Sequence, residues 1–111
     1  MNVRFNESVL RVDDTDHVLD FPIIDAATDG DRVYVVFDYT AFPKNKPAGN
    51  LSAYDKDGHR LWTVSGNPID HPTAAYTNII DLKPLTVGNF AGFVCQINET
   101  TGELIQSDFT K

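Results

Sequence analysis

The chain has 111 residues, enough for one domain with one modest core, and its 41% hydrophobic and 23% charged residues are ordinary for a soluble globular protein. Sixteen acidic against nine basic side chains give a net charge of -7, which disfavours nucleic acid as a partner because phosphate binding depends on Lys and Arg. The sequence contains no apolar run of about 18 residues, so we expect no membrane span. The N-terminal MNVRFNESVL lacks a signal peptide's apolar segment and the single cysteine cannot form an internal disulfide, so we expect a cytoplasmic protein.

The acidic residues are concentrated at the beginning of the chain. Nine of the sixteen lie within residues 1–38, and only Arg4 and Arg11 oppose them before Arg32. Such a segment would attract and steer a basic protein partner. The alternative interpretation is that these charges only keep the domain soluble.

The first predicted elements are two strands separated by a turn. Residues 17–24, HVLDFPII, predict a strand that is bulged or at a sheet edge, because Pro22 cannot donate to a ladder. Residues 28–31, TDGD, have the composition of a turn. Residues 32–39, RVYVVFDY, are the clearest strand, since β-branched and aromatic residues follow a period of two.

The middle of the chain predicts a hairpin between two loops. Residues 40–50 contain two prolines and a glycine and predict a loop without a regular element. Residues 51–55 and 60–64 predict two short strands, because Asp-Gly between aromatic-rich runs is a strong hairpin signal. Residues 66–77 predict a second loop, in which 72–76 could form one helical turn.

Three further strands are predicted at residues 78–84, 92–98 and 102–109. The expected fold is therefore all-β: a single antiparallel domain over residues 1–111, a meander or small two-sheet sandwich of about eight short strands with at most one short helical turn. The residues expected in its core are Val33, Val35, Phe37, Leu61, Trp62, Phe93, Cys95 and Ile97.

The DKDG segment raises the question of a metal site. An EF-hand loop that began at Asp55 would place His59 at position 5, Arg60 at position 6 and Gly66 at position 12, where Asp, Gly and Glu are required. Asp55 to Gly58 therefore predict a plain hairpin turn. The three carboxylates of DDTD, residues 13–16, likewise predict a solvated turn, so no metal and no cofactor is expected.

No catalytic constellation is evident in the sequence. His59 falls in the predicted hairpin turn, His71 in a loop, and no nucleophile elbow, phosphate-binding loop or metalloprotease motif occurs. Cys95 alternates with Phe93 and Ile97, which favours a small buried side chain over a reactive thiol. Tyr54 and Trp62 are expected to pack together in the core. We therefore expect a protein that is not an enzyme.

Two hairpin sequences, YDKDGHRLW and INETTGELI, are similar to each other and to one strand pair of a quinoprotein propeller blade. A propeller needs at least four blades of about 40 residues, so a chain of 111 residues is too short, and the pattern is interpreted as local turn chemistry.

A broader resemblance covers most of the chain. FPIID, DRVYVVFD, NLSAYDKDGHRLWTV, YTNI and the closing INETTGELIQSDFTK are similar to a group of small acidic bacterial proteins of the type that includes immunity proteins of toxin systems, such as contact-dependent growth inhibition. The resemblance implies a binding protein that neutralises a cognate toxin. The shared motifs are strands and turns, so the resemblance implies no site residues.

The functional expectation combines this resemblance with the charge pattern. The expected partner is a basic protein, with a nuclease-type toxin as the concrete case: an acidic inhibitor could occupy its cationic surface for phosphates. The alternative is a small β structural or interaction module with another partner. The candidate contact residues are five carboxylates and two aromatic anchors, Asp13, Asp14, Asp16, Asp20, Asp38, Tyr39 and Phe42.

Overall fold

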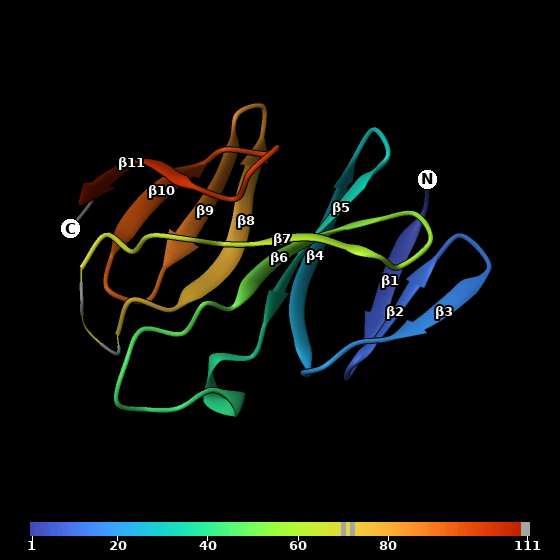
Figure 1. The fold of residues 1–111 in the computed structure, drawn as a ribbon, viewed down its shortest axis with the longest axis horizontal. Helices are drawn as coiled ribbons and strands as arrows, with labels where there is room; N and C mark the ends of the chain where they lie inside the picture. Colours follow the sequence, from blue (N-terminus) through green and yellow to red (C-terminus); the bar gives the residue numbers. More distant parts are fainter. Residues whose placement is uncertain (70, 72, 110–111) are drawn as a thin grey trace.

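The protein is built from eleven strands in three antiparallel sheets, shown in Figure 1; the computed structural model describes residues 1–69, 71 and 73–109. The N-terminal sheet contains β1 (Val3–Asn6), β2 (Val9–Val12) and β3 (Thr15–Val18). The central sheet contains β4 (Ile23–Asp29), β5 (Arg32–Phe37), β6 (Leu51–Asp55) and β7 (Arg60–Thr63). The C-terminal sheet contains β8 (Tyr76–Leu82), β9 (Leu85–Asn89), β10 (Phe93–Ile97) and β11 (Leu104–Phe109).

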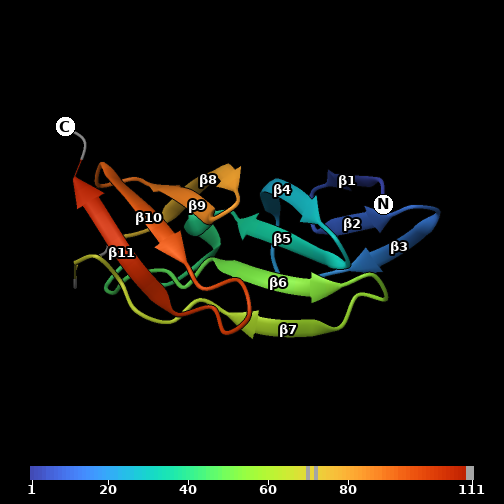
Figure 2. The same cartoon turned by 90° about the horizontal axis from the view of Figure 1, so that it is seen from above.

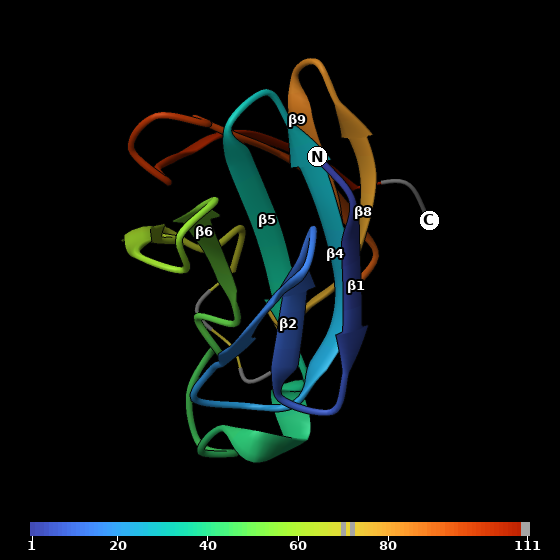
Figure 3. The same cartoon turned by 90° about the vertical axis from the view of Figure 1, so that its right-hand side faces the viewer.

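The three sheets are stacked in chain order, with the central sheet between the other two. Each sheet is a simple meander in which strands that follow one another in the chain pair antiparallel, and the longest connection within a sheet is the segment 38–50 between β5 and β6. The first strands of the sheets lie next to one another, β1 against β4 and β4 against β8. Figure 2 shows this arrangement from above, and Figure 3 views it with the N-terminal sheet nearest the reader.

The central sheet is buried on both faces, which explains the nearly continuous apolar sequence of β5. Val33, Val35 and Phe37 point to the N-terminal sheet, where they join Leu10 of β2 in one core. The alternate residues of the same strand point to the C-terminal sheet and pack with its side chains in a second core. Because successive side chains of a strand alternate between faces, one strand supplies both cores.

Two polar side chains connect the central sheet to the C-terminal sheet. The buried Asn50 amide donates to the carbonyl oxygens of Phe37 and Tyr76 at 2.8 and 2.7 Å, and its oxygen accepts the Tyr76 N–H at 2.9 Å. The Asp25 carboxylate on β4 accepts the Ile79 N–H of β8 at 2.7 Å. These bonds fix the position of β8 relative to β4 and β5.

A contact between a glycine and an aromatic ring is repeated at both junctions between the sheets. Gly58, in the β6–β7 turn, has φ +82°, and a Cβ there would lie 2.7 Å from Cγ of His17 on β3. Gly102, in the β10–β11 turn, has φ +81°, and a Cβ there would lie 2.7 Å from Cδ2 of Trp62 on β7. Each ring thus covers the turn glycine of the following sheet, and we call this the ring-on-glycine contact.

The two ends of the stack depart from this repeat. Asp13, in the β2–β3 turn, has φ +53° and lies 45 residues before Gly58, which itself lies 44 residues before Gly102. No sheet precedes the N-terminal sheet in the described chain, so no ring covers this turn, and a side chain is tolerated there. His17 lies four residues after Asp13, and Trp62 lies four residues after Gly58. The equivalent position in the C-terminal sheet, four residues after Gly102, is the exposed Gln106.

The outer faces of the stack are largely polar. In the N-terminal sheet, the register places Arg4, Arg11 and Asp16 together on the face that points away from the core. In the C-terminal sheet it places Gln96 opposite Gln106 on the corresponding face. Polar end faces are typical of terminal units in a stack of repeats, since they end the packing of one unit against the next.

The all-β class predicted from the sequence is confirmed, and the structure adds detail to it. There are eleven described strands instead of about eight and three sheets instead of two. The predicted strand 17–24 is wrong as one element, because β3 ends at Val18 and β4 begins at Ile23. A short 3₁₀ turn occurs at Tyr39–Ala41, at the beginning of the predicted loop 40–50.

The second predicted loop and the strand after it also differ in detail. Of the segment predicted to form one helical turn, Pro72 lies outside the described residues, residues 73–75 are not helical, and Tyr76 already belongs to β8. The predicted strand 78–84 is β8, which ends at Leu82 and forms a hairpin with β9.

Most of the predicted core is confirmed, with two corrections. Leu61 is 47% exposed, because the register of β6 and β7 shifts beside it and turns its side chain outward. Tyr54 and Trp62 do not pack together: Trp62 lies opposite Ala53, so Tyr54 faces the N-terminal sheet and Trp62 the C-terminal sheet. Phe93 is partly buried at the edge of the second core.

Candidate functional site

Three hairpin turns gather acidic side chains at one end of the molecule. In a meander, alternate turns lie at the same end of the strands, so the β4–β5 and β6–β7 turns are neighbours. The strand register agrees with this, because Arg32 lies opposite both Asp29 and Asp55. The β6–β7 turn packs on His17, which places the N-terminal sheet beside it, and the β2–β3 turn is at the same side in Figures 1 and 2. We call this surface the acidic end; its carboxylates are Asp13, Asp14, Asp16, Asp29, Asp31, Asp55 and Asp57.

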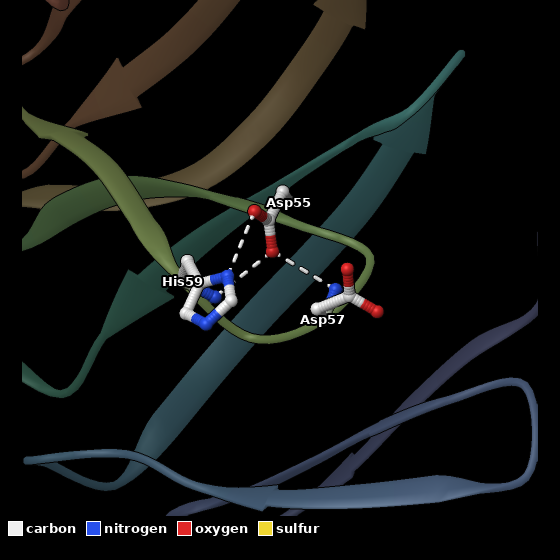
Figure 4. Close-up of polar contacts among 3 residues, drawn as sticks. All are labelled: Asp55, Asp57 and His59. Carbon is white, nitrogen blue, oxygen red and sulfur yellow. Dashed lines mark hydrogen bonds and ion pairs between the residues drawn. The ribbon is translucent and has the colours of Figure 1, made fainter.

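The β6–β7 turn is held in shape by one carboxylate, as Figure 4 shows. Oδ1 of Asp55 accepts the backbone N–H groups of Asp57 and His59, each at 2.9 Å, and Oδ2 lies 3.1 Å from Nδ1 of His59. The backbone N–H of Gly58 donates to the Asp55 carbonyl at 3.1 Å. The hydrogen bond from the His59 amide is the main reason that the pKa of Asp55 lies below its ordinary value. The hairpin turn predicted from DKDG is confirmed.

The same three residues form the one cluster of His, Cys, Asp or Glu within reach of a single ion in the described part of the chain. One ligand atom from each of Asp55, Asp57 and His59 can be chosen so that these atoms lie within 4.8 Å of one another. The hydrogen bonds of the turn already account for this proximity, because both Asp55 oxygens are engaged by it. The cluster is therefore explained as turn structure.

The carboxylates of the β2–β3 turn have different roles. Asp13 accepts the backbone N–H of Asn2 at 2.8 Å, which holds the beginning of the chain against this turn. Asp16 forms an ion pair with Arg11 at 3.3 Å on the outer face of the N-terminal sheet. Asp14 is exposed and makes no hydrogen bond or ion pair with the side chain of another described residue. Of these three carboxylates, Asp14 is the one most available to a partner.

The other two turns of the acidic end each present a similarly available carboxylate. Asp29 lies 3.7 Å from Nζ of Lys83, so its charge is partly compensated. Asp31 and Asp57 are exposed, and neither carboxylate has a hydrogen-bonded or ion-paired side chain among the described residues. Each of the three turns therefore carries one exposed, uncompensated carboxylate: Asp14, Asp31 and Asp57.

The remaining predicted contact residues lie elsewhere. Asp38 follows β5 at the end opposite the β4–β5 turn, and its carboxylate accepts the Thr40 amide and hydroxyl at 2.9 and 2.7 Å. These bonds lower the pKa of Asp38, the hydroxyl contributing most. Asp20 lies in the segment between β3 and β4, at the far end of β3 from the β2–β3 turn.

The two predicted aromatic anchors are also at that far end, and they differ from each other. Phe42 is partly buried against Phe21, with ring centroids 4.4 Å apart, so it belongs to the first core. Tyr39 is exposed and lies 5.6 Å from the ring of Phe90. The seven predicted residues therefore do not form one surface. Asp31 and Asp57 were missed as candidates, and the alternation of turns in a meander is the signal that could have found them.

The second core buries two titratable side chains, Cys95 and Tyr76. Cys95 is fully buried, as predicted, and burial raises the pKa of its thiol to about 11. Burial also raises the pKa of Tyr76, whose hydroxyl has no hydrogen-bond partner in the described part of the structure. A thiol with a raised pKa is a poor nucleophile near neutral pH.

The fold and its surface define a small protein of three stacked antiparallel sheets with acidic turns at one end. In the described residues, no helix is both long and apolar enough to cross a membrane. Residues 1–109 match the family model described as a domain of unknown function, DUF7957, so the chain belongs to that family. No curated protein matches the sequence.

Proposed function

We propose that this is a non-enzymatic binding protein whose acidic end docks on a basic protein, most concretely as an immunity protein that binds and neutralises a cognate toxin. The observation that carries the proposal is the presence of Asp14, Asp31 and Asp57 on three turns at the same end of the molecule. The net charge of -7 would add a long-range attraction for a cationic partner.

A toxin that cleaves nucleic acid is the partner class that fits this chemistry best. Such an enzyme holds phosphates with Lys and Arg, and carboxylates on an inhibitor can occupy the same cationic groups. Exposed charges would mainly raise the association rate, while a few pairs that lose water in the interface would slow dissociation.

The β4–β5 and β6–β7 turns, which carry Asp31 and Asp57, are suited to this role because their backbones are fixed. The Asp55 hydrogen bonds hold the β6–β7 turn, and the contact of Gly58 with His17 seats it on the N-terminal sheet. The β4–β5 turn is closed by Gly30 with φ +61°. A preformed surface loses less conformational entropy on binding than a mobile one.

The test measures binding to the product of the gene next to the one that encodes this chain. The triple variant Asp14→Asn, Asp31→Asn and Asp57→Asn should reduce the association rate by about tenfold or more at low salt and weaken its salt dependence. The same variant should fail to protect cells that express the neighbouring gene product. Surface plasmon resonance at several salt concentrations and a co-expression growth assay are the measurements.

A matched control carries the same change in charge on the C-terminal sheet and its turn: Glu99→Gln, Glu103→Gln and Asp108→Asn, all exposed in the wild type. The association rate of this control should fall only by the small amount that follows from its lower net charge. Equal association rates for the two triple variants would contradict the assignment to the acidic end. Failure of the wild-type protein to bind or protect would refute the immunity proposal and leave the alternative of an interaction module with another partner.

A further inference from the structure

At the end of the molecule opposite the acidic end, three loops enclose a small apolar pocket, which we call the loop pocket. It has a volume of about 250 Å³ and lies where the central and C-terminal sheets meet. Its residues come from the loop after β5, from the segment before β8 and from the β9–β10 turn: Tyr39, Thr40, Pro43, Lys44, Lys46, Ala48, Thr73, Ala75 and Phe90.

The walls of the loop pocket are tied together by backbone and buried side-chain hydrogen bonds. The Phe90 N–H donates to the Ala75 carbonyl at 2.8 Å, which joins two of the three walls. Asn50, two residues after Ala48, bonds to both Phe37 and Tyr76 and so fixes the third wall to the beginning of β8. A pocket framed in this way is present before any ligand arrives, as is usual for small-molecule sites.

The aromatic side chains at the pocket are unusually exposed for their type. Phe90 is 59% exposed and Tyr39 is 36% exposed, and their ring centroids are 5.6 Å apart at an angle of 47°. Beside them, the buried Ala48 and Ala75 leave room that larger side chains would fill. A third aromatic ring could pack against this pair and would remove apolar surface from water.

The charge at the pocket is opposite to that of the rest of the molecule. Lys44 and Lys46 both line it, no Asp or Glu does so in the described part of the chain, and the chain as a whole carries sixteen acids against nine bases. Neither lysine forms an ion pair with a carboxylate among the described residues. Two unpaired ammonium groups beside an apolar hollow fit an anionic group attached to an apolar one.

The size of the pocket limits the apolar group to about one ring. A cavity of about 150 Å³ holds benzene, whereas sites for drug-sized ligands begin at about 300 Å³. We infer that the loop pocket binds a small carboxylic acid that carries a single aromatic ring, with the ring against Tyr39 and Phe90 and the carboxylate near Lys44 and Lys46. This inference is independent of the proposed function, which uses the other end of the molecule.

The test is a titration of the isotope-labelled protein with phenylacetate, followed by amide NMR shifts. Saturable shifts are expected at Tyr39, Ala75 and Phe90, with a dissociation constant of about 1 mM or tighter for a ligand of this size. Phenylacetamide, which keeps the ring without the charge, and acetate, which keeps the charge without the ring, should each bind at least about threefold more weakly.

Variants assign the binding to the pocket. Lys44→Gln with Lys46→Gln should weaken phenylacetate binding by about threefold to tenfold, and Phe90→Ala should weaken it similarly. The amide spectra of these variants should remain those of a folded protein. Lys56→Gln with Lys83→Gln is the control with the same loss of charge, and it should bind phenylacetate as the wild type does. Absence of saturable shifts up to about 10 mM, shifts elsewhere on the protein, or equal weakening in both lysine pairs would overturn the inference. Binding of a peptide with an acidic residue next to phenylalanine, without binding of phenylacetate, would overturn it in favour of a protein partner.

Discussion

Single glycines determine how closely the sheets can approach. Gly58 and Gly30 both have positive φ, but only Gly58 is covered by a ring, since nothing lies within 4 Å of a Cβ placed on Gly30. A left-handed backbone costs an L-residue about 1 to 2 kcal/mol wherever it occurs. Comparing substitutions at Gly58 and Gly30 therefore distinguishes the free-energy cost of backbone strain from the cost of disturbing the contact between sheets.

We expect Gly30→Ala to lower the free energy of unfolding by about 1 kcal/mol and Gly58→Ala to lower it by about 2 to 4 kcal/mol, because the new methyl group must displace His17. Urea denaturation of both variants is the measurement. In the double variant Gly58→Ala with His17→Ala, the two changes should cost less than the sum of the single ones. Equal losses for Gly58→Ala and Gly30→Ala would contradict a role for the ring.

The buried thiol of Cys95 should make stability depend on alkaline pH. Burial raises its pKa to about 11, so the folded protein keeps the proton at a pH where the unfolded chain, with a thiol pKa of about 8.5, loses it. The contribution of this thiol to stability is complete below about pH 8.5 and is lost as the pH rises to about 11. Urea denaturation at several pH values should show a steeper loss for the wild type than for Cys95→Ala; identical slopes would refute the assignment.

Residue-level features were predictable from sequence where the cause is local. The turn at Asp55–Gly58 follows from Asp-Gly chemistry, and the burial of Cys95 follows from alternation along one strand. The outward orientation of Leu61 depends on a register shift between β6 and β7, which no local pattern reveals. The compensation of Asp16 by Arg11 depends likewise on the pairing of β2 with β3.

At the scale of elements, the link between the central and C-terminal sheets depends on Asn50. Its three buried hydrogen bonds join the end of β5 to the beginning of β8, although Asn50 itself lies in neither strand. Buried polar groups that lose their partners each cost about 1 to 3 kcal/mol. The residue therefore works as a connector between two sheets whose apolar faces are already in contact.

Asn50→Ala should reduce the free energy of unfolding by about 3 to 5 kcal/mol, because it leaves the carbonyl groups of Phe37 and Tyr76 and the amide of Tyr76 without their side-chain partner. Asn67→Ala, at an exposed loop position, is the control and should change stability by about 0.5 kcal/mol or less. Guanidinium denaturation compares the two. A loss for Asn50→Ala as small as that of the control would show that the connector is dispensable.

The prediction of elements succeeded where strands are long and strongly patterned. β5, β10 and β11 and the β6–β7 hairpin are close to their predicted ranges. The N-terminal sheet was missed because its three strands have four residues each and their outward side is charged, so their periodicity is weak. The acidic end was predicted only in part, since the sequence showed the density of carboxylates but not which turns lie together.

At the scale of the whole molecule, the repeat relates the three described sheets to one another. The resemblance between the two hairpin sequences reflects an equivalent position in successive sheets, and it is more than a local turn preference. The outer faces of the first and last described sheets are largely polar, unlike the faces that are buried between the sheets. Asp13 and Gln106 stand where a further repeat would need a glycine and a ring.

Replacing both end residues should therefore make the molecules associate head to tail. Asp13→Gly removes the side chain from the first turn, and Gln106→Trp supplies a ring on the last sheet, so one molecule could imitate the next sheet of another. Such a contact between different surfaces forms rings or open chains. Sedimentation velocity should show larger species that grow with concentration for the double variant and monomers for the wild type and each single variant. A monomeric double variant would contradict the role of the ring-on-glycine contact.

The burial of both faces of the central sheet has a consequence for how the molecule opens. Its backbone amides can exchange with solvent only after two packed interfaces separate, whereas the N-terminal sheet contributes to one core alone. Hydrogen exchange should therefore be slowest in β5 and β6 and faster in β1 to β3, which we expect to open together as one unit of local unfolding. Asp14 belongs to that less protected unit, while Asp31 and Asp57 belong to the most protected one. A partner that binds all three turns would hold the N-terminal sheet in place and lower its amide exchange rate to that of the central sheet.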